Sequence, residues 1–171
     1  MEINNMADYS NVMLQQCPGS IGDTSEYNID GACFVSESVA SVVCGQIVAV
    51  KSVVDGYKEI TNQIPGGLAY GVALRSALVL GKNANGRRAY LSGDPISVVS
   101  HGRVWVLTNT IQSQPRPGSA VKTSASGIAS NAGSEIYGWT YTGGFIKWDE
   151  TYWLVEVQIK QSSAFLRPDA V

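Results

Sequence analysis

The chain has 171 residues, of which 44% are apolar and 15% are charged, a balance typical of one folded domain and outside the range of disordered or fibrous proteins. Twelve basic and fourteen acidic residues give a net charge of −2. No general cationic field is therefore available for a phosphate backbone, and we expect no direct contact with nucleic acid.

The N-terminal part of the chain, residues 1–32, is polar and rich in turn-forming residues. We predict an extended N-terminal arm over residues 1–32, a β domain over residues 33–160 and a loose C-terminal tail over residues 161–171. The first ten residues contain two acids and no basic apolar run, and no segment reaches the ~18 apolar residues that cross a bilayer. We therefore expect neither a secretion signal nor a membrane partner.

The three cysteines, Cys17, Cys33 and Cys44, include no CxxC pair. An odd number without paired spacing predicts neither a closed disulfide framework nor a zinc site. Cys33 and Cys44 lie in apolar runs, where a thiol usually behaves as a small hydrophobic group. A reducing compartment is the expected environment.

Three units punctuated by glycine follow and predict β-hairpins. Their bounding glycines are Gly45 and Gly56, Gly93 and Gly102, and Gly118 and Gly127. Separations of 11, 9 and 9 residues are those at which short strands recur in sandwiches and barrels. We therefore predict an all-β, single-domain β-sandwich or barrel, jelly-roll-like, built from short antiparallel strands.

Two further segments refine the strand prediction. After Gly102, apolar residues such as Val104 and Trp105 point to both faces, so this strand should be covered on both sides. Residues 67–81 could form a helix, but each glycine in a helix costs about 1 kcal/mol, and we favour strand and loop. Residues 151–160 should form the last strand of the sheet.

The titratable residues do not form a catalytic pattern. His101 is the sole histidine and lies beside Gly102 in the predicted turn, where a solvated residue is the ordinary interpretation. Asp94 and Glu156 have no spacing that would pair them. We expect no enzyme, no cofactor and no metal site. The competing hypothesis of a hydrolase on a β-barrel would need a second titratable partner for His101.

Two features indicate protein binding. Arg87 and Arg88, next to Tyr90, can clamp carboxylates of a partner, although a solvated loop is the more ordinary interpretation. Six aromatic residues also crowd into fifteen positions, Trp139, Tyr141, Phe145, Trp148, Tyr152 and Trp153. Core packing should account for about half of them, and any that stay exposed would be good interface anchors.

Several segments resemble the structural cement proteins, or head decoration proteins, of tailed bacteriophages. The segments are YGVAL, GDPISVVSHGRVWVL and WLVEVQI, and the similarity rests most on Gly93, Asp94, Val98, Gly102, Val104 and Trp105. The early PGSIGD also resembles the N-terminal region of that family. A second Gly-Asp step is expected before the next strand, but the chain has Pro117-Gly118-Ser119 instead. The resemblance covers about residues 17–160.

The resemblance implies a non-enzymatic virion protein on the outer surface of a bacteriophage head, assembled in the host cytoplasm. It would bind the major capsid protein and further copies of itself, as a dimer or trimer, and stabilise the expanded shell across capsomer joints. The expected partner-binding residues are Pro18, Gly19, Ile21, Arg87, Arg88, Tyr90, Trp139, Tyr141 and Trp148. The alternative is another virion binding module, a tail or fibre component that binds a glycan through the aromatic residues near Trp148.

Overall fold

The computed structural model describes residues 16–160, which form ten β-strands and no helix. The strands are β1 (Asn28–Val35), β2 (Ser41–Val43), β3 (Ile47–Val54), β4 (Tyr57–Thr61), β5 (Gly71–Ala73), β6 (Ala89–Leu91), β7 (Pro95–Thr108), β8 (Ala120–Thr123), β9 (Ser134–Lys147) and β10 (Trp153–Ile159). The predicted all-β class is confirmed. Residues 67–81 contain only β5 and loops, as the strand-and-loop interpretation expected.

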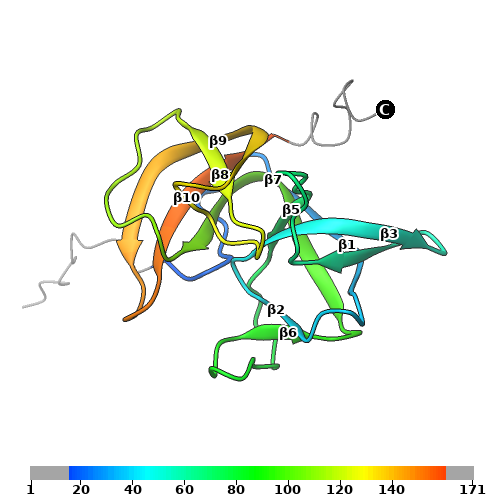
Figure 1. Ribbon diagram of the computed structural model, residues 1–171. Helices are drawn as coiled ribbons and strands as arrows, with labels where there is room; N and C mark the ends of the chain where they lie inside the picture. The colour runs from blue at the N-terminus through cyan, green and yellow to red at the C-terminus, as the bar shows by residue number, and fades with distance from the viewer. Residues whose placement is uncertain (1–15, 161–171) are drawn as a thin grey trace, which may run out of the picture.

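Five of the strands close into a barrel (Figure 1). They are hydrogen-bonded in the order β1–β4–β3–β5–β7, and β1 also pairs with β7, which completes the ring. The β1–β4 pairing is parallel, whereas the other pairings of the ring are antiparallel. Closure pairs the backbone groups that an open sheet would expose along its edges.

Strand β7 belongs to the barrel and to a second sheet. Its first half pairs with β1 and β5, and its second half, from Gly102 to Thr108, pairs with β10. Strand β10 then pairs with β9, and β9 with β8. The second sheet therefore continues directly from one wall of the barrel (Figure 1).

The hairpin predicted around Gly102 is wrong, because Gly102 lies inside β7 and not in a turn. Its φ is +102°, and a Cβ added there would lie 2.7 Å from the Cβ of Tyr27. Glycine is required here because the backbone is left-handed and another segment approaches closely. A turn also selects glycine for its left-handed backbone, so the two situations look alike in the sequence. His101 consequently lies on a strand and is half-buried.

Of the other predicted strands, some are confirmed and one is absent. The hairpin between Gly45 and Gly56 is confirmed as β3 and β4, and the predicted last strand is confirmed as β10. Of the hairpin predicted around Gly118 and Gly127, only the first strand is present, as β8. The predicted second strand forms only isolated bridges at Ala129.

Two hydrophobic cores lie on opposite sides of the barrel wall. The core inside the barrel takes a residue from each of its five strands, Val35, Val48, Ile60, Ala73 and Val98. The larger core lies between the outside of the barrel and the second sheet, and packs Ile47, Val72 and Val99 against Trp139, Val155 and Val157. In β7, Val104 faces this larger core and Trp105 faces a third cluster, so the predicted covering on both sides is confirmed.

The segment before β1 packs along β7. The N–H groups of Gly19 and Gly22 donate to the carbonyl oxygens of Trp105 and Arg103, at 2.8 and 2.7 Å. The boundary predicted at residue 32 falls within β1, because closure of the barrel requires this strand. The rest of the predicted arm, residues 1–15, and the predicted tail, residues 161–171, lie outside the described residues.

Candidate partner-contact surface

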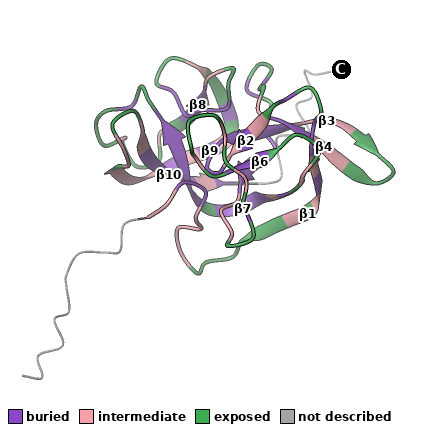
Figure 2. Ribbon diagram, turned by 90° about the horizontal axis from the view of Figure 1, so that it is seen from below, coloured by how far each residue is buried: buried purple, intermediate pink, exposed green. Residues whose placement is uncertain are grey.

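The hairpin of β3 and β4 extends beyond the barrel (Figures 1 and 2). The residues at its tip are mostly apolar. Val53, Val54 and Tyr57 are 63%, 50% and 57% exposed. A strand that leaves the barrel has no second layer to cover it, so its side chains remain in solvent on both faces. Apolar residues gathered at such a tip are typical of contact with another molecule.

The turn at this tip has a defined geometry. Asp55 and Gly56 both have positive φ, 51° and 83°, which is the pattern of a type I′ turn. The backbone twist of this turn matches the twist of the two strands that it joins. The tip is therefore the end of a regular ribbon and not a loose loop.

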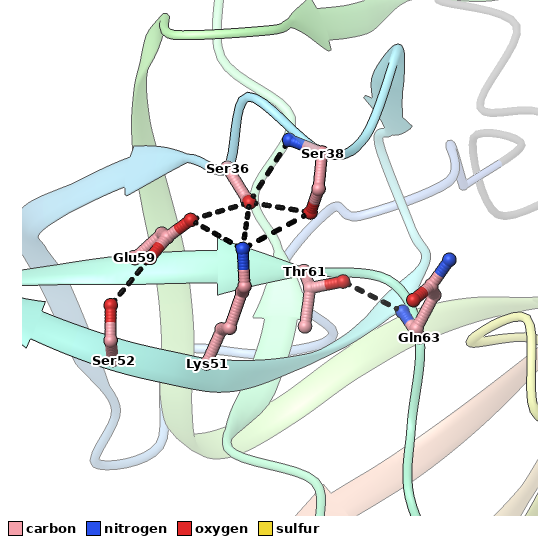
Figure 3. Close-up of polar contacts among 7 residues, drawn as sticks. All are labelled: Ser36, Ser38, Lys51, Ser52, Glu59, Thr61 and Gln63. Carbon is pink, nitrogen blue, oxygen red and sulfur yellow. Dashed lines mark hydrogen bonds and ion pairs between the residues drawn. The ribbon is translucent and has the colours of Figure 1, made fainter.

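A network of hydrogen bonds braces the root of the hairpin (Figure 3). Lys51 Nζ lies 3.1 Å from Glu59 Oε1 and donates to the hydroxyls of Ser36 and Ser38 at 3.2 and 3.3 Å. Glu59 also accepts hydrogen bonds from Ser36 and Ser52. These bonds, first that from Ser36 and then those from Ser52 and Lys51, lower the pKa of the Glu59 carboxyl to about 2.

A second ion pair fixes the opposite face of the hairpin. Lys58 Nζ lies 2.8 Å from Asp30 Oδ2, and the hydroxyl of Tyr70 donates to the same carboxylate. Burial opposes ionisation of Asp30, but the hydrogen bonds from Lys58 and Tyr70 outweigh it and lower the pKa to about 2. The hairpin is thus tied to the barrel through Glu59 on one face and Lys58 on the other.

The outer face of the hairpin continues into a hollow. Cross-strand pairing sets Val54 opposite Tyr57, Ser52 opposite Glu59, and Ala49 opposite Thr61, so these pairs share one face. Near the last pair lies a hollow of about 850 Å³, lined by Lys51, Thr61, Gln63 and Ile64 among others. The hollow and the apolar tip lie on the same hairpin and together form the candidate contact surface.

The structure separates the predicted contact residues into two groups. Trp139, Tyr141 and Tyr90 are buried, as are Pro18 and Gly19, and Ile21 packs against the larger core. Trp139 and Tyr141 belong to the larger core, so their interpretation as contacts is corrected to core packing. Trp148, on which the glycan alternative centres, is only partly buried.

Arg87, Arg88 and Trp148 remain accessible, and they meet at one cavity. Pro18, Arg75 and Lys82 line the same cavity. Arg87 is paired with Asp149 at 2.9 Å, and its guanidinium carbon lies 4.5 Å from the centre of the Tyr152 ring. The structure thus brings four of the predicted residues together, Pro18, Arg87, Arg88 and Trp148, from segments far apart in the chain.

The exposed tip was not among the predicted contact residues. The signal was present, since VVDGY places apolar residues directly beside a two-residue Asp-Gly turn. A second exposed apolar pair, Leu78 and Leu80, lies in the loop between β5 and β6. Neither position could be recognised as uncovered before the closure of the barrel was known.

Two of the three cysteines, Cys33 and Cys44, are buried. Burial raises the pKa of Cys33 to about 12 and that of Cys44 to about 11, so both act as the small hydrophobic groups that were predicted. Within residues 16–160, no three histidine, cysteine, aspartate or glutamate side chains converge as metal ligands would. The same part of the chain contains no helix long and apolar enough to cross a membrane.

Comparison with known proteins places the chain in a family. The model of the XM1 gp53 minor capsid protein family matches residues 6–159. A chain from a structure of the capsid of Myoviridae phage XM1 superposes with a TM-score of 0.54 at 14% identity, over 86% of this chain and 96% of that chain. At this identity the likeness shows a shared fold alone. No curated protein sequence matches.

The family match spans most of the 171 residues. It confirms the association with a bacteriophage capsid that the resemblance to cement proteins predicted. The chain belongs to the XM1 gp53 minor capsid protein family, a family of structural proteins of the bacteriophage capsid.

Proposed function

We propose that the protein is a cement protein that binds the major capsid protein on the outer surface of the head and stabilises the expanded shell across capsomer joints. The observation that carries this proposal is the β3–β4 hairpin, which presents Val53, Val54 and Tyr57 to solvent beyond the barrel. The family membership supports the same role, since its proteins are minor components of a capsid.

The hairpin tip has the chemistry of an interface anchor. Tyrosine is enriched among the residues that dominate binding energy, and aliphatic neighbours exclude water around it. Val54 and Tyr57 are opposite each other on one face of the ribbon, so one pocket on a capsid subunit can receive both. Burial of these side chains on binding would contribute most of the contact energy of the tip.

The bracing of the hairpin favours binding as well as folding. Side chains and loops that must be ordered on association reduce affinity. Here the type I′ turn and the ion pairs of Lys51 and Lys58 hold the ribbon in place before contact. The tip is therefore preorganised, and little conformational entropy is lost when it inserts into a partner.

The stabilising mechanism needs no catalysis. A protein that binds the expanded lattice, and not its precursor, stabilises the lattice in proportion to its binding free energy. Symmetry repeats the contact over the shell, and association as a dimer or trimer would multiply a modest affinity. The net charge of −2 favours the outer surface, because the inner surface faces packaged DNA.

The test is binding to purified phage heads that lack the protein. The tip variant Val53→Thr/Val54→Thr/Tyr57→Thr keeps residues that favour strands but removes the apolar anchor. We expect it to bind heads about tenfold more weakly or worse, since anchor residues carry most of an interface. The matched control is Tyr137→Thr in β9, because Tyr137 and Tyr57 are both 57% exposed.

The control variant should bind heads within about twofold of the unmodified protein. Heads decorated with unmodified protein should also withstand heating or osmotic shock better than bare heads. Equal binding by the tip and control variants would refute the role of the hairpin. Failure of the unmodified protein to bind or to strengthen heads would refute the cement function itself.

A further inference from the structure

A basic cavity lies away from the hairpin tip, between the β2–β6 ribbon, the loop that joins β5 to β6, and the turn between β9 and β10. It has a volume of about 330 Å³. Four cationic side chains line it, Arg75, Lys82, Arg87 and Arg88. These are a third of the 12 lysines and arginines in a chain whose net charge is −2.

No carboxylate is among the described residues that line this cavity. Asp149, which is not part of this lining, pairs with Arg87. The guanidinium groups of Arg75 and Arg88 lie near the buried Cys44, where they partly oppose the effect of burial on its pKa. The four positive charges border one cavity. Arg87 pairs with Asp149 and Arg88 donates to the carbonyl of Val79, but no other carboxylate among the described residues pairs with them, which leaves a charge that an anionic ligand would balance.

One wall of the cavity is rigid and the rest is partly apolar. Arg87 is held by its ion pair with Asp149 and by its position over the ring of Tyr152, so its orientation is set before any ligand arrives. Trp148 and Leu107 contribute apolar surface to the lining. A ligand that fits must combine negative charge with an apolar group.

The size and shape of the cavity favour a polypeptide over a nucleic acid. A volume of about 330 Å³ admits side chains but not a duplex. Guanidinium groups match carboxylates through paired hydrogen bonds, and the apolar wall suits an aromatic or aliphatic neighbour. The loop from β5 to β6 also carries the exposed Leu78 and Leu80, which indicates that this side of the molecule meets another protein.

We infer that the basic cavity is a second docking site, which receives an acidic peptide segment, with an apolar residue beside its carboxylates, from a capsid subunit. The inference rests on the proposed function and names the chemistry of the partner. The β3–β4 tip and the β9–β10 turn lie on opposite sides of the molecule (Figures 1 and 2). One copy could then hold two subunits, with the tip on one and the cavity on the other.

The first experiment needs no capsid. A labelled peptide of four glutamates around one phenylalanine is titrated into the purified full chain, with the corresponding lysine peptide, inorganic phosphate and a short DNA duplex as competitors. We expect saturable binding that the double variant Arg75→Glu/Arg88→Glu weakens at least tenfold. The control Arg116→Glu, an exposed arginine of the β7–β8 loop, should leave the affinity within twofold.

Two further variants test whether a loss of binding comes from misfolding and whether the peptide binds at this cavity. Arg75→Gln/Arg88→Gln removes the charge without reversing it and should bind more weakly than the unmodified protein but better than the glutamate variant. Trp148→Phe should remove the change in tryptophan fluorescence that accompanies binding. Equal affinity of all arginine variants, absence of saturable binding, or stronger displacement by phosphate or DNA than by unlabelled peptide would overturn the inference.

The second experiment separates the inference from the proposed function. Phage heads are titrated with the Arg75→Glu/Arg88→Glu variant and with the tip variant. We expect the charge-reversed protein to bind at least tenfold more weakly, and its remaining binding to be less sensitive to salt. If the charge-reversed variant binds heads normally and the tip variant does not, the cavity is not a capsid contact and the proposed role of the tip stands. If the tip variant binds heads normally and the charge-reversed variant does not, the role of the tip fails and that of the cavity stands.

Discussion

The β3–β4 hairpin and the β9–β10 ribbon are both antiparallel pairs, joined by two and five residues, yet Trp139 and Tyr141 of one are buried while Tyr57 of the other is exposed. Trp139 and Tyr141 of β9 are 1% and 6% exposed, whereas Tyr57 of β4 is 57% exposed. The β9–β10 ribbon lies against the outer wall of the barrel and shares the larger core. The outer part of the β3–β4 hairpin passes beyond that wall, where no layer covers it (Figure 2).

The comparison shows that aromatic content alone does not identify a contact surface. Aromatic residues on the barrel side of β9 are core, whereas Tyr137 on its other face is as exposed as Tyr57, because a second layer covers only one face of the ribbon at that point. The β9–β10 ribbon should therefore determine stability, and the hairpin tip should determine binding. The following substitutions test whether stability and binding are divided between the two regions in this way.

The largest effect is expected at the buried indole of β9. Trp139→Ala removes the largest fully buried side chain and leaves a cavity, so it should lower the free energy of unfolding by about 3–5 kcal/mol. Tyr57→Ala, which truncates an aromatic residue at the tip, should change it by less than about 0.5 kcal/mol. Urea unfolding followed by circular dichroism measures both, and equal losses would break the comparison.

An intermediate effect is expected at the base of the hairpin. The pKa of Asp30 is lowered to about 2 from 3.8, so its ion pair contributes stability that is complete above about pH 4 and is lost as the pH falls toward 2. Asp30→Asn should cost about 1–2 kcal/mol at pH 7, allowing for the partial exposure of the pair to solvent.

The pH dependence separates this ion pair from a packing effect. Thermal melting between pH 7 and pH 2 should show a smaller acid-induced loss of stability in Asp30→Asn than in the unmodified protein. Some loss should remain, because the pKa of Glu59 is also lowered to about 2 and its contribution disappears over the same range. An unchanged acid profile would show that Asp30 does not carry the stabilisation assigned to it.

The smallest effect is expected at the turn. Gly56 has a φ of +83°, and a Cβ added there would meet no other atom within 4 Å, so Gly56→Ala meets backbone strain without a clash. It should cost about 1 kcal/mol, whereas Gly56→Asn, which tolerates the left-handed region better, should cost less. Head binding should follow the same order if the shape of the tip matters. A larger loss with asparagine than with alanine would contradict this account.

The sequence alone predicted a substantial part of the fold. Gly45 and Gly56, each at the start of an apolar-rich run, predicted the first hairpin because turn glycines act over a few positions. The alternation from Trp153 to Ile159 indicates a strand for a similarly local reason. Gly102 misled the prediction because a close backbone approach within a strand and a tight turn both require glycine. The arginines of the cavity were recognised in part, but Arg75 and Lys82 join Arg87 and Arg88 only in space.

Local chemistry therefore determined the all-β class, most of the strands and the apolar character of the thiols, because periodicity and turn residues act over a few positions. Tertiary structure decided which apolar residues are covered, where the barrel closes and which charges converge. These depend on pairings between distant segments, such as β1 with β7 and residues 19–22 with β7. The contact surfaces of this protein are what those long-range pairings leave uncovered.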